Sequence, residues 1–398
     1  MTTTMEKSRA WHGWPLFSYG FRPFFLFGAL HAALMVALWV PWFLGLIDMP
    51  SAFAPVTWHI HELLFGYVPA IIAGFLLTAI PNWTGRLPVV GWPLVGLVLI
   101  WFLGRVMVAF SDLLPMPLVV AGALAFTFVL VALFGREIVA GKNWRNLKII
   151  AVLIAFLAAQ VLFYYEAFAT GAPDYAVRAG IALIVQLILI VGGRVVPSFT
   201  RNWLKRSGAL KLPSGFGAFD QLVMIASGAA LAVWGLAPIL QGEITGAILM
   251  IAGGLNLLRQ IRWHPLPTWR EPLVAILHVA FFTVSAGFLM AGFAAFQNDP
   301  LIASAAIHCW TVGGIGGMTL AMMTRASRGH TGQSLHAPLT TSTLYALIVI
   351  AVLARILAGF VPDFWTQFVT VAGLCWFLAF AGFGVVYGPM LLRKREGV

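Results

Sequence analysis

Residues 116–135 read MPLVVAGALAFTFVLVALFG, and this stretch contains no charged side chain. At a rise of about 1.5 Å per residue, an α-helix of this length crosses the roughly 30 Å hydrocarbon core of a membrane. Similar apolar stretches recur from residue 24 to residue 391, separated by short connections. They lack the strict alternation of apolar and polar residues that a membrane β-barrel requires. The sequence therefore predicts an all-α, polytopic membrane protein.

We expect twelve transmembrane helices that form a single membrane domain, 24–391. This domain lies between an N-terminal segment, 1–23, and a C-terminal tail, 392–398. The expected helices are 24–46, 58–80, 90–111, 116–139, 147–169, 177–196, 218–238, 242–260, 271–295, 300–324, 338–360 and 365–391.

The ends of three of these helices resemble one another. The second helix runs into PNWT at 81–84, the sixth into PSFT at 197–200, and the tenth into MTR at 323–325. Because three other helices separate each of these helices from the next, the similarity of their ends is consistent with three four-helix units. Chance similarity of short polar motifs is the alternative.

Composition excludes several functional classes. The chain is 61% hydrophobic and 9% charged, whereas soluble domains carry roughly a quarter charged residues. A soluble enzyme is therefore excluded. The net charge of +11 comes from cations in short loops, which argues against a nucleic-acid partner, because nucleic-acid binders cluster their cations on a folded surface.

The positions of the cations predict the orientation in the lipid bilayer. All but three of the 24 Lys and Arg residues fall on one side of the expected helices, among them Lys7, Arg9 and Arg395. Since cytoplasmic loops carry the excess of Lys and Arg, both termini are expected to be cytoplasmic.

Two of the three remaining cations lie inside membrane helices. Arg105 and Arg355 fall in the outer thirds of the third and eleventh helices. An ionisable group within the bilayer is costly unless it is paired, so both are functional candidates. The alternative is that they reach the interface or form ion pairs with Glu166 or Asp112.

Histidines gather at the same depth. His59 and His61 open the second helix, and His308 lies on the tenth. A bis-imidazole haem needs one His from each of two facing helices, and His61 and His308 differ in depth by only about four residues, which helix tilt can absorb. Arg105 and Arg355 lie where haem propionates would need cations. The alternative is that these histidines are hydrogen-bonded interfacial residues.

Other polar residues in the membrane complete the list of candidates. Glu62 and Glu166 are candidates for proton transfer, with salt bridges as the alternative. His31 and His278 are candidates for a second, inner site, although for His31 a structural role in the core is favoured. The glycines at 192–193 and 313–317 are expected to permit close helix packing. A CxxCH motif is absent, so any haem would be non-covalent and b-type.

Several stretches resemble the NnrS family of bacterial membrane proteins tied to nitric oxide metabolism and nitrosative stress. They are FRPFF at 21–25, WHIHELLFG at 58–66, GFLLTAIPNWTG at 74–85, GGRVVPSFTRN at 192–202, LH at 277–278, and the run 308–332 with MMTRA at 322–326 and GHTG at 329–332. They span almost the whole chain.

The resemblance implies a twelve-helix protein of the bacterial inner membrane that contains haem and copper. It implies a ligand pool of His59, His61, His278, His308 and His330, and it leaves His31 outside the motifs. A looser similarity links His61, His308 and Arg355 to haem–copper oxidases and nitric oxide reductases. The sixth and seventh expected helices carry no His, so the copper site of those enzymes does not carry over.

The expected function is binding and detoxification of nitric oxide, with reduction to nitrous oxide as the enzymatic form. That reaction would need protons, from Glu62 or Glu166, and electrons, from quinol or another donor. Two alternatives stay open at this point. One is a secondary transporter that exports a metal–nitrosyl or thiol species, and the other is a haem or copper sensor without turnover.

Overall fold

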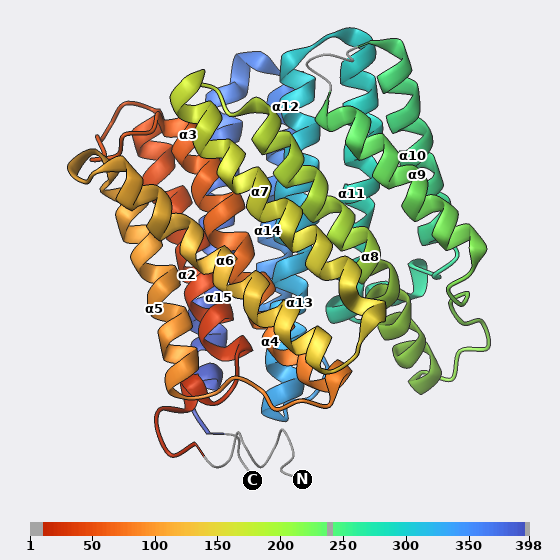
Figure 1. Ribbon diagram of the computed structural model, residues 1–398. Coiled ribbons are helices and arrows are strands. Elements are labelled where there is room, and N and C mark those ends of the chain that lie inside the picture. The colour runs from red at the N-terminus through yellow and green to blue at the C-terminus, as the bar shows by residue number, and fades with distance from the viewer. Residues whose placement is uncertain (1–10, 237–241, 395–398) are drawn as a thin grey trace. The chain divides into compact units, whose positions relative to one another are not determined.

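The computed structural model describes residues 11–236 and 242–394, and within them every regular element is a helix (Figure 1). Twelve helices are long and apolar enough to cross a membrane, which confirms the predicted fold class. Lys7, Arg9 and Arg395 lie outside the described residues.

Four of the twelve spans combine an α-helix with other helical segments. The second joins α3 (Pro55–Ile60), η2 (His61–Tyr67) and α4 (Val68–Thr84). The fifth joins η4 (Trp144–Asn146) to α7 (Leu147–Ala169). The tenth joins α12 (Pro300–His308), η6 (Cys309–Gly316) and α13 (Gly317–Thr331). The twelfth joins η7 (Pro362–Phe364) to α15 (Trp365–Leu392).

The other spans are single α-helices. They are α2 (Phe21–Phe43), α5 (Trp92–Ala109), α6 (Met116–Ala140), α8 (Asp174–Arg206), α9 (Ala218–Gly235), α10 (Glu243–Ile261), α11 (Pro272–Gln297) and α14 (Leu339–Phe360). Short 3₁₀ turns connect some of them: η1 (Pro15–Ser18), η3 (Ser111–Leu113) and η5 (Leu266–Arg270).

The sixth and tenth helices are longer than the hydropathy pattern predicted. The sixth was expected to end at residue 196, but α8 continues through Pro197 to Arg206. The tenth continues past residue 324 to Thr331. Polar residues remain compatible with a helix once it leaves the hydrocarbon, so hydropathy marks the membrane boundary and not the end of the helix. The PSFT and MTR motifs are therefore helical.

Among the described residues, the chain divides into two compact units. The first contains the residues up to Gly180, Ala326–Ser334 and the residues from Phe380 onward. The second contains Ile181–Arg325 and Leu335–Ala379. The three four-helix units suggested by the similar motifs at three helix ends stay a prediction.

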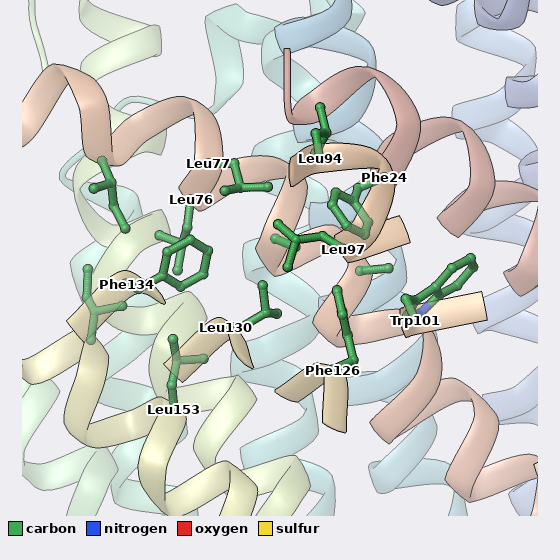
Figure 2. Packing of buried hydrophobic residues seen from close by; sticks show 14 of the residues in the cluster. Phe24, Leu76, Leu77, Leu94, Leu97, Trp101, Phe126, Leu130, Phe134 and Leu153 are labelled. Atoms are coloured by element: carbon green, nitrogen blue, oxygen red, sulfur yellow. The ribbon is translucent and has the colours of Figure 1, made fainter. Parts of the chain in front are cut away.

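The core of the first unit is built from α2, α4, α5, α6 and α7. Figure 2 shows Leu97 and Trp101 of α5 beside Phe24 of α2 and Phe126 of α6. The Trp101 indole donates a hydrogen bond to the Gly66 carbonyl at 2.9 Å. The core thereby fixes α5 against η2, one helical turn from Arg105.

Glycines bring the helices of the second unit close together, as the sequence predicted. A Cβ atom at Gly313 would lie 2.6 Å from the Thr283 side chain, and one at Gly316 would lie 2.5 Å from Trp376. At Gly193 it would lie 2.3 Å from the guanidinium of Arg259. These glycines admit neighbouring side chains that any larger residue would displace.

Candidate functional site

A π-helical segment interrupts the second span where its polar residues are concentrated. Residues His61–Tyr67 form η2, and the Val68 amide reaches back to the Leu63 carbonyl. This wider turn is rare and frequently marks a functional site. His61 and Glu62 are its first two residues, and both side chains are almost completely buried.

Glu62 lies at the centre of a buried group of polar side chains. Its Oε1 atom is 2.7 Å from Arg105 Nη1 and 2.9 Å from His61 Nδ1. Its Oε2 atom is 3.1 Å from His31 Nε2. Arg105 and His31 are each 7% exposed. The guanidinium that neutralises the Glu62 carboxylate is therefore itself shielded from solvent. Such a pair persists in a low-dielectric interior only when its hydrogen bonds are well formed.

Tyr164 of α7 completes this group. Its hydroxyl lies 2.6 Å from His61 Nε2. An ionised carboxylate only accepts hydrogen bonds, so His61 Nδ1–H donates to Glu62. His61 Nε2 then carries the lone pair and accepts from the Tyr164 hydroxyl. We call Glu62, Arg105, His31, His61 and Tyr164 the Glu62 cluster.

Aromatic side chains surround the imidazole of His61. Phe53 stacks on it with an interplanar angle of 3°, and Phe163 lies 5.2 Å away between ring centroids. On the other side of the cluster, Gly66 leaves room for Arg105, because a Cβ atom there would lie 2.6 Å from Arg105 Nη1. The Glu62 cluster is therefore an enclosed polar site in an apolar environment.

The partners suggested for Arg105 from the sequence were wrong. Arg105 pairs with Glu62 and not with Glu166 or Asp112. Glu166 instead accepts a hydrogen bond from the Ala176 amide at 2.9 Å, at the start of α8. This contact gives Glu166 a structural role at a helix N-terminus, and its role in proton transfer stays a prediction.

A second π-helical segment, η6, follows His308 in the second unit. His308 Nδ1 lies 2.7 Å from the Ser304 carbonyl, which can only accept, so Nδ1 carries the proton. Arg355 Nη2 of α14 lies 3.2 Å from both ring nitrogens. His308 Nε2 therefore presents its lone pair towards a guanidinium.

Arg355 differs from Arg105 in its environment. Arg355 Nη1 is buried and makes no hydrogen bond within the described part of the chain. No carboxylate of residues 11–236 or 242–394 forms an ion pair with Arg355. Within these residues, the positive charge of Arg355 is therefore not balanced by a salt bridge.

The sequence matches the family described as NnrS protein over residues 15–395. The chain belongs to the NnrS family. This confirms the resemblance drawn from the sequence motifs. No curated protein matches the chain.

In this NnrS-family chain, the motif stretches coincide with the polar sites. WHIHELLFG at 58–66 covers the last three residues of α3 and most of η2, and the run 308–332 covers η6 and α13. The motif residue Thr200 lies 2.8 Å from His278 Nε2. Because the Thr200 hydroxyl donates to the Val196 carbonyl, His278 Nε2–H donates to Thr200. His278 Nδ1 then carries a lone pair, is buried and makes no hydrogen bond.

The other two histidines of the predicted ligand pool contact aromatic rings of the first unit. His59 stacks on Trp39 at 4.0 Å between ring centroids. His330 is exposed and stacks on Tyr19 at 5.8 Å. Within residues 11–236 and 242–394, no three His, Cys, Asp or Glu side chains are grouped so as to hold a metal ion. The five-histidine pool stays a prediction.

Two members of the Glu62 cluster were not predicted from the sequence. His31 was expected to have a structural role, and Tyr164 was not among the candidates. A further buried ion pair was also not predicted. Arg259 is fully buried in α10 and pairs with Asp220 at 2.9 Å. The signal for Tyr164 was a polar aromatic residue one turn after Gln160 on a mostly apolar helix, and this signal is weak on its own.

Proposed function

We propose that this NnrS-family protein binds haem and copper in the bacterial inner membrane and detoxifies nitric oxide, reducing it to nitrous oxide. The observation that carries the proposal is the His308–Arg355 pair. It joins an oriented imidazole to a partly buried guanidinium that forms no salt bridge with a carboxylate in the described part of the chain.

The residues of this pair fit a haem. Histidines that ligate metals commonly donate their second ring N–H to a backbone carbonyl, which fixes the tautomer and the ring orientation. His308 has this backbone contact, with Nδ1–H donating to Ser304, and Nε2, which lies 3.2 Å from Arg355 Nη2, would be the atom that binds iron. Arg355 would bind a propionate, because a guanidinium matches a carboxylate in charge and geometry. Bound haem supplies an iron that takes up nitric oxide and exchanges electrons.

The Glu62 cluster suits the handling of protons. Nitric oxide reduction consumes protons, and in this cluster Tyr164, His61 and Glu62 are linked by hydrogen bonds. Both ring nitrogens of His61 are bonded to side chains, so we assign His61 to this chain of hydrogen bonds. Ligation of haem by His61, as expected from the sequence, would require His61 Nε2 to give up its hydrogen bond with the Tyr164 hydroxyl.

His278 supports a separate role in copper binding. Its Nδ1 lone pair is buried and has no hydrogen-bond donor, and imidazole nitrogen is a common copper ligand. The resemblance drawn from the sequence keeps His59 and His330 as further candidate metal ligands.

The bilayer itself favours this reaction. Nitric oxide is small and neutral, so it reaches a lipid-embedded site without a channel. The cation-rich connections orient both termini to the cytoplasm in this proposal, and a membrane quinol is the proposed electron donor.

Anaerobic turnover by the purified protein tests the proposal. With excess quinol, we expect nitric oxide to be consumed and nitrous oxide to form, two molecules of the first giving one of the second. A haem-loaded protein that consumes no nitric oxide under these conditions would remove the enzymatic part of the proposal.

A further inference from the structure

Tyr164 is buried in a way that prepares its hydroxyl proton for transfer. The residue is 3% exposed, and its hydroxyl oxygen lies 2.6 Å from His61 Nε2. That nitrogen carries the ring's lone pair, because Nδ1–H is committed to Glu62. The phenol therefore faces a base along a short hydrogen bond.

This geometry favours the one-electron oxidation of Tyr164. Removing one electron from a phenol makes its proton strongly acidic, and a radical cation buried among apolar side chains would be costly. A buried tyrosine is therefore oxidised readily only when its proton can move at the same time to a nearby base. His61 Nε2 is that base.

The rest of the cluster stabilises the product of such a transfer. A protonated His61 would be a buried cation, and its Nδ1–H already donates to the Glu62 carboxylate at 2.9 Å. Arg105 and His31 hold that carboxylate in place from its other sides. The charge formed on His61 would thus lie next to a fixed negative charge.

We propose that Tyr164 is a redox-active tyrosine that donates one electron to a neutral oxidant dissolved in the bilayer. Nitrogen dioxide represents this class of oxidant. In the step, the Tyr164 O–H bond breaks, the proton passes to His61 Nε2, and the electron passes to nitrogen dioxide. The products are a neutral tyrosyl radical, a protonated His61 and nitrite. The step uses residues of the first unit alone and does not depend on haem at His308.

Two other tyrosines provide matched controls. Tyr165 is the next residue on α7, but it is 69% exposed. Tyr345 of α14 is buried, and its hydroxyl contacts the Thr324 hydroxyl. Neither is assigned the role proposed for Tyr164.

The test uses the full-length protein in lipid nanodiscs, with nitrogen dioxide generated by pulse radiolysis. Freeze-quench electron paramagnetic resonance then measures the tyrosyl radical. We expect a radical in the wild type, in Tyr165→Phe and in Tyr345→Phe, and its loss in Tyr164→Phe. Oxidation in deuterated buffer should be slower, because the proton moves together with the electron.

Several results would overturn the proposal. They are the absence of a radical in the wild type, a radical that persists in Tyr164→Phe, and a radical that disappears in Tyr165→Phe. His61→Gln should lower the radical yield because it removes the base. If that variant does not fold, the isotope effect on the wild type decides, and an unchanged rate in deuterated buffer contradicts the proposed transfer.

Discussion

His308→Ala is expected to abolish haem binding while the protein still inserts into the membrane. The substitution removes the one side chain that presents an oriented ring nitrogen beside Arg355. The neighbouring Cys309 does not replace it, because its Sγ atom contacts Met290 Sδ at 3.4 Å. The measurement is haem per chain, from the reduced pyridine haemochrome of purified protein.

A control variant and added imidazole make this prediction specific. His12→Ala removes an exposed histidine and should leave the haem content unchanged. Free imidazole should restore part of the haem signal to His308→Ala by occupying the vacated space. Wild-type haem content in His308→Ala would exclude the tenth helix as the source of the ligand.

Arg105→Met is expected to destabilise the protein by about 3–5 kcal/mol, because it leaves the Glu62 carboxylate buried without its guanidinium. The expected readout is a large fall in the Tm of the detergent-solubilised protein. The double variant Glu62→Gln with Arg105→Met should recover much of this loss, since it removes both charges together.

Arg136→Met provides the matched comparison. It also removes an Arg–Glu ion pair, with Glu137, but the Arg136 side chain is 67% exposed. Exposed pairs contribute only about 0–1 kcal/mol. Equal Tm values for Arg105→Met and Arg136→Met would mean that the Glu62 cluster is not the buried ion pair described above.

The second and tenth spans share an arrangement that was not predicted from the sequence, where the similarity concerned residues 81–84 and 323–325. In each, a π-helical segment begins at or just after a histidine, and an arginine on the next membrane helix contacts the polar residues there. The residue after the histidine differs, being Glu62 in one span and Cys309 in the other. This difference separates a charge-balanced site at Arg105 from an uncompensated one at Arg355, and it underlies their different proposed roles.

Hydropathy was sufficient to predict the twelve membrane helices, because the cost of exposing polar groups to lipid dictates long apolar runs. It did not predict how each helix is rotated about its axis. The contact between Tyr164 and His61 depends on the rotation of α7 relative to η2. The inward direction of Arg259 depends on Asp220 and on the space left by Gly193. Partners of this kind arise from tertiary packing and leave no periodic signal.

The most direct measurement is the haem and copper content of the purified wild-type protein, together with its visible spectrum. The account predicts a Soret band and stoichiometric amounts of haem and copper. A correctly folded but colourless protein, with neither haem nor copper by elemental analysis, would contradict it and would favour a transporter.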